Sequence, residues 1–147
     1  MRKYTSIFAS HRHTPIHTMK QFKGLRSREA SLTLFCNNTM VGSGGLILQG
    51  PTTLHTEYVG LDKGFRRKGH GIHLYFALID TAKKIGATRI YSSSNLNKFS
   101  RRMWAEKLRG YFEVKEFRSR KRCRRCGCRC NGNKKRPTQY YIDLRKT

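Results

Sequence analysis

The sequence predicts an α/β (α+β) fold with a mixed, mostly antiparallel central sheet flanked by helices. Two observations predict it. Strand-like segments follow one another between Ala30 and Asp62, a stretch that contains no Lys or Arg, and an amphipathic helical pattern begins at Ile72. The chain has 147 residues, of which 37% are hydrophobic, and this is enough for one buried core. We therefore expect residues 1–147 to form a single domain.

The first three predicted strands form an antiparallel unit. Segment 31–36 alternates apolar and polar residues, and two asparagines supply a turn before the Gly-rich, extended segment 40–49. A Gly-Pro pair then breaks the chain before segment 53–61. These three segments are expected to form the centre of the sheet.

After the third strand the pattern changes from a period of two to a helical period. Ile72, Tyr75, Phe76 and Ile79 lie on one helical stripe, and Gly86 is a typical helix end. The order that follows from these patterns is β-β-β-α-β-α-β-β, after about 30 N-terminal residues for which no element is predicted. The later elements are a strand at 88–92, a helix from Asn95 or Asn97 to about Leu108, and strands at 111–117 and 139–144.

A basic, Gly-rich loop joins the third strand to the first predicted helix. The run Arg66-x-x-Gly69-x-Gly71 combines two glycines with three consecutive cations, Arg66, Arg67 and Lys68. Glycine lets backbone N–H groups approach an anion closely, and the first turn of a helix leaves such donors unpaired. The pattern predicts a phosphate-binding loop. The alternative is a Gly-rich turn beside a solvated basic face.

In this setting of strand, loop and helix, the chain resembles the GNAT superfamily of N-acetyltransferases over roughly Ser31 to Leu144. Gly86, a strand, Asn97 and the segment 106–108 follow the loop at the family's usual distances. The resemblance implies acetyl-CoA as cosubstrate, with its pyrophosphate on the loop and its pantetheine arm along the preceding strand. For Asn97 an ordinary helix N-cap is the alternative. The coenzyme-binding residues that the family resemblance implies are Val59, Leu61, Arg66, Arg67, Lys68, Gly69, His70, Gly71 and Asn97.

Two titratable residues precede the loop on the same predicted strand. By strict alternation, His55, Glu57 and Val59 share one face. Acetyl transfer to an amine needs a base that removes the amine proton. The resemblance adds that some amine acetyltransferases carry paired histidines at these two offsets. Glu57 and His55 are therefore the catalytic candidates, with Glu57 ahead; the alternative is that both are polar residues on a solvent-exposed face.

The residue at the family's usual acid position departs from the family pattern. The resemblance implies a tyrosine seven residues after Asn97, where this chain has Trp104. An indole N–H is a hydrogen-bond donor only and does not protonate a thiolate. Ser100, Tyr91 or water are the substitutes considered. Trp104 is expected on the apolar side of its helix, together with Phe99, Met103 and Leu108.

A basic, Cys-rich insertion is expected at residues 118–137, as a finger between the last two strands. Ten of the 19 residues from Arg118 to Arg136 are Lys or Arg. Four cysteines within eight residues are enough for a tetrahedral zinc site, with His11, His13 or His17 as an outside ligand. The alternatives are reduced free thiols and redox-sensitive disulfides. The predicted metal ligands are Cys123, Cys126, Cys128 and Cys130.

The charge of the chain predicts a polyanionic partner. Its 32 Lys and Arg residues stand against 8 Asp and Glu residues, a net charge of +24. We expect a nucleic acid or a ribonucleoprotein, with RNA favoured over DNA. A membrane partner is not expected, because no apolar stretch approaches 18 residues. The N-terminus lacks the long apolar run of a signal peptide and the cysteines are clustered, so a cytoplasmic location is expected.

These observations combine into one expected function and two alternatives. The expected function is an acetyl-CoA-dependent N-acetyltransferase that acts on an amine presented by a nucleic acid or ribonucleoprotein, such as an aminoacyl-tRNA or a ribosomal protein. The first alternative is a catalytically inactive nucleic-acid-binding protein of the same fold, which Trp104 favours and which His55, Glu57 and the phosphate loop oppose. The second is a small-amine acetyltransferase whose charge serves localisation.

Overall fold

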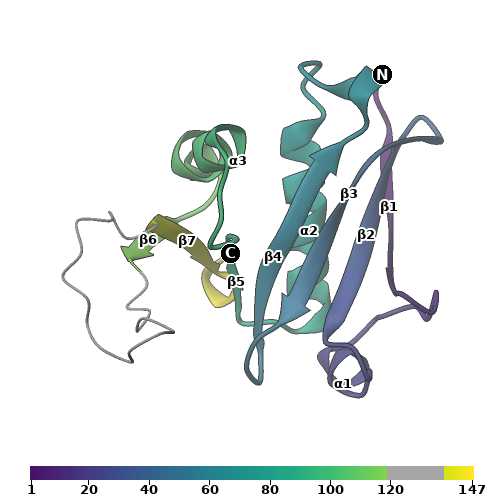
Figure 1. Cartoon of the computed structure of the whole chain (residues 1–147), viewed down its shortest axis with the longest axis vertical. Helices are drawn as coiled ribbons and strands as arrows, with labels where there is room; N and C mark the ends of the chain where they lie inside the picture. Colours follow the sequence, from purple (N-terminus) through teal and green to yellow (C-terminus); the bar gives the residue numbers. More distant parts are fainter. Residues whose placement is uncertain (119–137) are drawn as a thin grey trace, which may run out of the picture.

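The computed structural model describes residues 1–118 and 138–147 (Figure 1). A seven-stranded sheet runs through it in the order β1-β2-β3-β4-β5-β7-β6. Among the described strands only β4 and β5 pair in parallel, so the predicted mixed, mostly antiparallel α/β fold is confirmed. The strands are β1 (Tyr4–Ser10), β2 (Glu29–Cys36), β3 (Thr39–Leu48), β4 (Thr53–Leu61), β5 (Arg89–Tyr91), β6 (Val114–Arg118) and β7 (Thr138–Asp143).

The N-terminal stretch contains two elements that the sequence patterns did not predict. β1 pairs with β2 over its whole length at the edge of the sheet, from Tyr4 opposite Cys36 onward. The helix α1 (Met19–Lys23) has only five residues and is held by a capping box between Thr18 and Gln21. A polar edge strand and a single helical turn carry too few periodic positions to stand out in a sequence.

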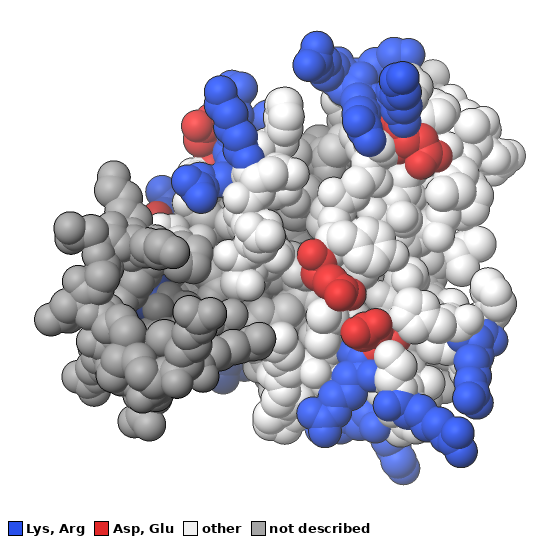
Figure 2. All heavy atoms as spheres, viewed as in Figure 1, with Lys and Arg blue, Asp and Glu red and all other residues white. Residues whose placement is uncertain are grey.

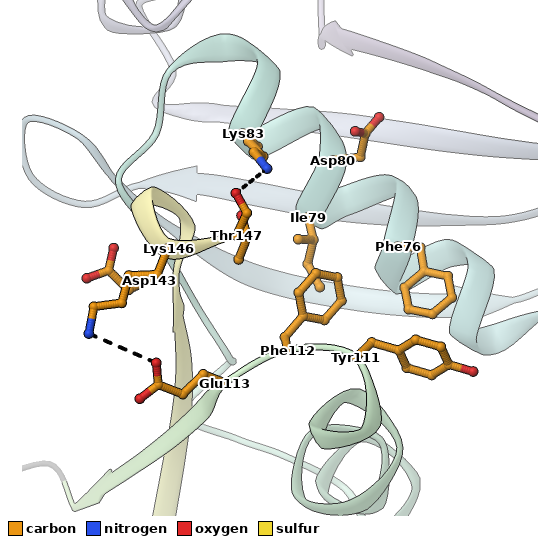
Figure 3. Close-up of a pocket in the computed structure, with 10 residues that line it drawn as sticks. All are labelled: Phe76, Ile79, Asp80, Lys83, Tyr111, Phe112, Glu113, Asp143, Lys146 and Thr147. Carbon is orange, nitrogen blue, oxygen red and sulfur yellow. Dashed lines mark hydrogen bonds and ion pairs between the residues drawn. The ribbon is translucent and has the colours of Figure 1, made fainter.

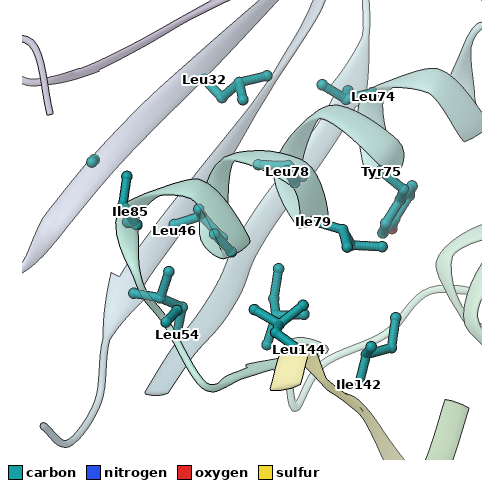
Figure 4. Packing of buried hydrophobic residues seen from close by; sticks show 14 of the residues in the cluster. Leu32, Leu46, Leu54, Leu74, Tyr75, Leu78, Ile79, Ile85, Ile142 and Leu144 are labelled. Atoms are coloured by element: carbon teal, nitrogen blue, oxygen red, sulfur yellow. The ribbon is translucent and has the colours of Figure 1, made fainter. Parts of the chain in front are cut away.

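The core lies between the sheet and the helix α2 (Gly71–Ile85), as Figure 4 shows. The helix comes so close to β3 that a Cβ atom on Gly44 would lie 2.9 Å from Leu78 Cδ1. Gly86 ends the helix with a left-handed φ of +97°, which confirms its predicted role. The buried side chains of the core include Leu32, Leu46, Leu54, Leu74, Leu78, Ile79, Ile85, Ile142 and Leu144.

β4 and β5 separate soon after they begin to pair. Their parallel ladder consists of three residue pairs and ends at His55 and Tyr91. β4 continues to Leu61, whereas the chain after β5 turns toward α3 (Lys98–Arg102), and Figure 1 shows α3 set apart from the far end of β4. Residues 56–61 therefore have no strand partner on this side within the described parts of the chain. Their backbone groups can bind a ligand there.

The second predicted helix is present but changes type along its length. Asn97 caps α3, which passes into a π turn (Met103–Lys107) and a 3₁₀ turn (Leu108–Gly110). Trp104 and Leu108 are fully buried, as predicted, but Phe99 is 73% exposed. The prediction that Phe99 belongs to the apolar side is wrong, because the wider π turn shifts the helical register between the two ends.

The last two strands form an antiparallel pair that runs from Val114 opposite Ile142 to Arg118 opposite Thr138. The segment between them lies outside the described residues. The basic insertion at 118–137 and the single domain over the whole chain therefore stay predictions. Among the described helices, none is long and apolar enough to cross a membrane. The cytoplasmic location also stays a prediction.

Candidate active site

The predicted phosphate-binding loop connects β4 to α2. Arg67 and Gly69 have left-handed backbone conformations, with φ values of +61° and +85°. Such residues turn neighbouring peptide N–H groups toward one side, as in anion-binding nests. α2 begins directly afterwards at Gly71, so the positive end of a 15-residue helix lies at the same place. This local geometry fits a pyrophosphate group.

Arg66 also fastens the loop to the strand before it. Its Nε donates a hydrogen bond to the carbonyl oxygen of Leu61, at 3.0 Å. Part of the guanidinium is therefore used to hold the end of β4, and its other N–H groups are left for an anion. The coenzyme contacts predicted for Val59, Leu61 and the loop residues stay predictions.

The N-terminal strand supports this loop from the other side. Arg2 Nη1 donates to the carbonyl oxygen of Lys68 at 2.8 Å, and the Tyr4 hydroxyl lies 3.0 Å from His70 Nδ1. The Tyr4 ring also stacks on His73, with 4.0 Å between ring centroids. No local sequence pattern indicates these contacts, because they join positions 66 to 69 residues apart.

The two histidines at this junction favour their neutral forms. Burial lowers the pKa of His70, and the positive charges of Arg2, His73 and Lys68 lower it further. The pKa of His73 is also lowered, mainly by burial and to a smaller extent by the positive charge of Arg2. A proton added to either ring therefore costs more in the folded protein than in the unfolded chain.

We expect the free energy of unfolding to fall as the pH drops from about 7.5 to about 5. The unfolded chain takes up protons on these histidines near their ordinary pKa of about 6.5, whereas the folded protein does so only at lower pH. Urea denaturation at the two pH values measures the loss. The fall in unfolding free energy should be smaller for the His70→Gln variant. His17 is exposed, so the His17→Gln variant should show the same fall as the wild type. An undiminished loss in His70→Gln would contradict the assignment.

A cavity of about 210 Å³ occupies the gap between the separated strands. Residues 56–59 of β4 form one wall, and Tyr75 reaches it from α2. Ser93 and Asn95, which follow β5, and Asn97 and Ser100 at the start of α3 complete the lining together with Leu96. The cavity thus brings a carboxylate, Glu57, and several hydroxyl and amide groups next to the open edge of β4.

The two predicted base candidates have different surroundings in the structure. β4 has a bulge in which Glu57 and Tyr58 lie opposite the single residue Gly45, so the alternation is interrupted. Glu57 lines the cavity, whereas the His55 ring stacks on Tyr91, with 4.7 Å between centroids and 7° between planes. Because Thr56 lies opposite Leu46 and Val59 lies opposite Gly44, Thr56 and Val59 share a face, and the predicted common face of His55 and Val59 is not observed. Burial lowers the pKa of His55, but the ring lies outside the cavity, and a base role for Glu57 stays a prediction.

Asn97 has the capping role that the sequence left open. Its Oδ1 accepts a hydrogen bond from the backbone N–H of Ser100 at 2.8 Å, so it is an N-cap. The residue also lines the cavity. A contact with the coenzyme stays a prediction, since capping and ligand binding can share one side chain.

The position of the expected acid is filled by a buried indole. Trp104 is fully buried, and its Nε1 makes no hydrogen bond of acceptable geometry within the described residues. Of the substitutes considered, Ser100 lines the cavity and Tyr91 does not. Tyr75, which the sequence indicated only as part of an apolar stripe, also lines it.

A larger cavity of about 430 Å³ lies along α2 and the last residues of the chain (Figure 3). Each of its three acidic side chains forms an ion pair. The pairs are Asp80–Lys84 (2.8 Å), Glu113–Lys146 (4.0 Å) and Asp143–Arg145 (2.7 Å). Hydrogen bonding to Arg145 holds the pKa of the Asp143 carboxyl far below its usual range. Since Glu57 and the open edge of β4 border the smaller cavity and not this one, the smaller one is the candidate active site.

The predicted zinc ligands cannot be compared with the structure. Cys123, Cys126, Cys128 and Cys130 all lie outside the described residues, so the zinc site stays a prediction. Within residues 1–118 and 138–147, no group of three or more His, Cys, Asp or Glu side chains is arranged to hold a metal ion. The described cysteine, Cys36, is buried and has a free thiol.

Comparison with known proteins agrees with this architecture. The model of the acetyltransferase (GNAT) family matches residues 2–111, which is most of the chain. No curated protein sequence matches closely enough to count as a relative.

Solved structures share the fold at low sequence identity. A spermidine/spermine N-acetyltransferase from Vibrio cholerae is 10% identical with a TM-score of 0.60, covering 98% of this chain and 94% of that one. The ribosomal-protein-S18-alanine N-acetyltransferase from Escherichia coli is 15% identical with a TM-score of 0.55 and the same coverage. An acetyltransferase from Bacillus subtilis, solved with CoA, is 16% identical with a TM-score of 0.54, covering 84% and 82%.

Proposed function

Because the chain belongs to the acetyltransferase (GNAT) family and takes its acetyl group from acetyl-CoA, we propose that it transfers this group to an amine presented by RNA or by a ribonucleoprotein. The family membership speaks against the alternative of an inactive binding protein. The nature of the acceptor rests on a surface next to the candidate active site and on the charge of the chain.

The donor half of the reaction uses the residues already described. Acetyl-CoA supplies the acetyl group as a thioester. The backbone N–H groups between Arg67 and Gly71 would hold its pyrophosphate, and the open edge of β4 would hold the pantetheine arm. Glu57 lines the cavity beyond that edge and would accept the proton that the amine loses.

The observation that carries the proposal is a row of rings across β4, β5, β7 and β6. This aromatic row consists of His55, Tyr91, Tyr141 and Phe117. Tyr91 stacks between His55 and Tyr141, at centroid distances of 4.7 and 5.1 Å, and Phe117 meets both tyrosines edge-on. The Arg89 guanidinium lies 5.7 Å from the centre of the Tyr141 ring.

The chemistry of the aromatic row suits an anionic, ring-bearing ligand. Because the His55 and tyrosine rings stack on one another, their faces are partly occupied, and their positively polarised edges and phenol hydroxyls are what they offer. Arg89 adds positive charge, as does Lys115, which is opposite Tyr141 in the β6–β7 ladder and also pairs with Glu113 at 3.6 Å. Hydrogen-bond donors, ring edges and cations together match the bases and phosphates of single-stranded RNA.

The aromatic row adjoins the candidate active site. His55 precedes Glu57 by two residues on β4, and Tyr91 precedes Ser93 by two residues after β5. Both Glu57 and Ser93 line the cavity. An RNA bound along the aromatic row would thus bring an attached amine to the cavity beside Glu57.

The distribution of charge supports the same kind of partner. Residues 118–136 account for ten of the 24 net positive charges, which leaves +14 on the rest of the chain. On the face in Figure 2, Lys and Arg side chains gather toward the top and the bottom, and acidic side chains lie in the otherwise uncharged middle. A free lysine-rich peptide would be repelled by such a surface, whereas RNA would be attracted.

Labelled acetyl-CoA tests the proposal directly. The purified chain is incubated with total RNA, ribosomes, DNA or spermidine, and transferred label is measured in each. We expect label on the RNA or ribosome fraction. Label on spermidine alone would identify a small-amine enzyme, and label on no acceptor would overturn the proposal.

The aromatic row provides a separate binding prediction. Tyr141→Leu removes a ring and a hydroxyl, so it should weaken binding of single-stranded RNA by about tenfold, the lower range for loss of one aromatic contact. Arg89→Gln should lower the slope of log K against log salt concentration by about one unit. Fluorescence anisotropy with a labelled RNA measures both quantities.

Tyr111→Leu is the matched control, because Tyr111 is 68% exposed and belongs to the larger cavity, not to the aromatic row. It should bind RNA like the wild type. Equal affinity of the Tyr141→Leu variant and the wild type would remove the aromatic row from the acceptor site.

A further inference from the structure

Tyr75 is a phenol side chain that borders the candidate active site. It stands in the second turn of α2 and lines the cavity together with Glu57 and Ser100. Its side chain is only 4% exposed, and its ring meets Trp104 edge-on with 6.0 Å between centroids. A phenol hydroxyl thus reaches the neighbourhood of Trp104 from a different helix.

The other side chains near this point are poor acids. The Trp104 indole has no proton that it can release at neutral pH, and it is fully buried. Ser100 lines the cavity but carries an aliphatic hydroxyl, a far weaker acid than a phenol. Tyr91 is a phenol, but it belongs to the aromatic row outside the cavity. Tyr58 is a phenol that lines the cavity, but its hydroxyl forms a hydrogen bond with Ser31 Oγ of β2, at 3.1 Å.

We propose that Tyr75 is the general acid of acetyl transfer and that its hydroxyl donates a proton to the sulfur of the departing coenzyme A. The amine nitrogen bonds to the acetyl carbon, the carbon–sulfur bond breaks, and its electron pair stays on sulfur. The Tyr75 proton converts that sulfur to a thiol. Glu57 takes the proton that the amine loses, and solvent returns one to Tyr75, so the proton count balances.

The surroundings of Tyr75 suit this role. Burial raises the pKa of its hydroxyl above the ordinary value of 10, while the neighbouring side chains of Ser100 and Trp104 oppose the rise. Tyr75 therefore keeps its proton at neutral pH and begins each cycle protonated. The inference depends on the family's use of acetyl-CoA and not on which acceptor is acetylated.

A pair of ligands tests the contact without any acceptor. Calorimetry compares CoA with desulfo-CoA, which lacks the sulfur, at a pH above about 8.5, the ordinary pKa of a thiol. Removing a hydrogen bond to a charged group typically weakens binding about tenfold or more. We expect Tyr75→Phe to weaken CoA binding by about tenfold and to leave desulfo-CoA binding within about twofold.

The kinetic counterpart uses a thioester with a better leaving group. With acetyl-CoA and an acceptor found by label transfer, or with slow hydrolysis by water, Tyr75→Phe should reduce kcat about 10²-fold. With the acetyl thioester of an acidic aromatic thiol, the loss should be only a few-fold, because that thiolate leaves without a proton. Ser100→Ala should change neither rate by more than a few-fold.

The proposal is overturned by either of two results. If Tyr75→Phe weakens the binding of CoA and of desulfo-CoA equally, or weakens neither, the hydroxyl does not contact the sulfur. If it slows both thioesters equally, Tyr75 only supports the packing around Trp104. Failure of RNA acetylation would leave the calorimetric result intact, so this inference and the proposed acceptor are tested separately.

Discussion

Glu57→Gln is expected to lower kcat for acetyl transfer by about 10²-fold, the lower range for loss of a general base. Glutamine keeps the size and hydrogen-bonding capacity of the side chain but cannot accept the amine proton. Binding of acetyl-CoA should stay within a few-fold of the wild type, because Glu57 lies in the cavity and not in the phosphate loop. Steady-state kinetics with the acceptor found by label transfer, together with calorimetry for acetyl-CoA, measures the two effects.

His55→Gln is the matched control for this prediction. His55 is on the same strand, two residues earlier, but it stacks on Tyr91 in the aromatic row and does not line the cavity. We expect an unchanged kcat and a raised KM for an RNA-linked acceptor. A fall in kcat as large as that of Glu57→Gln would restore His55 as a base, and an unchanged kcat in Glu57→Gln would exclude Glu57.

Trp104→Ala is expected to lower the free energy of unfolding by about 3–5 kcal/mol, as for other large aromatic residues removed from a core. Trp104 is fully buried, and its ring packs edge-on against Tyr75. Truncation leaves a void that the surrounding π turn and α2 can fill only partly. Urea denaturation at neutral pH measures the change.

Phe99→Ala is the matched control, since Phe99 is an aromatic residue of the same helical segment and is 73% exposed. Its change in unfolding free energy should stay within about 0.5 kcal/mol. An equal effect of both substitutions would mean that the buried and exposed sides of this segment are wrongly distinguished.

Regular patterns in the sequence predicted most of the fold. The alternation in 31–36 and the stripe of α2 each report which face of an element is buried, and the structure confirms both. β1 and α1 escaped prediction, because an edge strand and a five-residue helix bury too few residues to impose a pattern. Phe99 was misjudged because the π turn changes the helical period within one segment.

The candidate site was predictable only where it is local in sequence. The loop from Arg66 to Gly71 depends on glycines, cations and a helix start, all of which are adjacent in the chain. The placement of Val59 on the face of His55 failed, because it assumed an unbroken alternation and β4 has a bulge at Glu57 and Tyr58. Tyr75 was assigned to the core, since a helical pattern does not distinguish a tyrosine that only packs from one whose hydroxyl borders a cavity.

By itself, the sequence predicted the fold class and the basic, Gly-rich loop before α2, and it carries the charge that favours a polyanionic partner. Each of these depends on neighbouring residues or on composition. Only the tertiary structure decided which titratable groups share a cavity. The divergence of β4 from β5 leaves the cavity that Glu57, Ser100 and Tyr75 line, and the packing of the π turn against α2 brings Tyr75 next to Trp104. Such groupings come from the packing of distant elements, which no local pattern encodes.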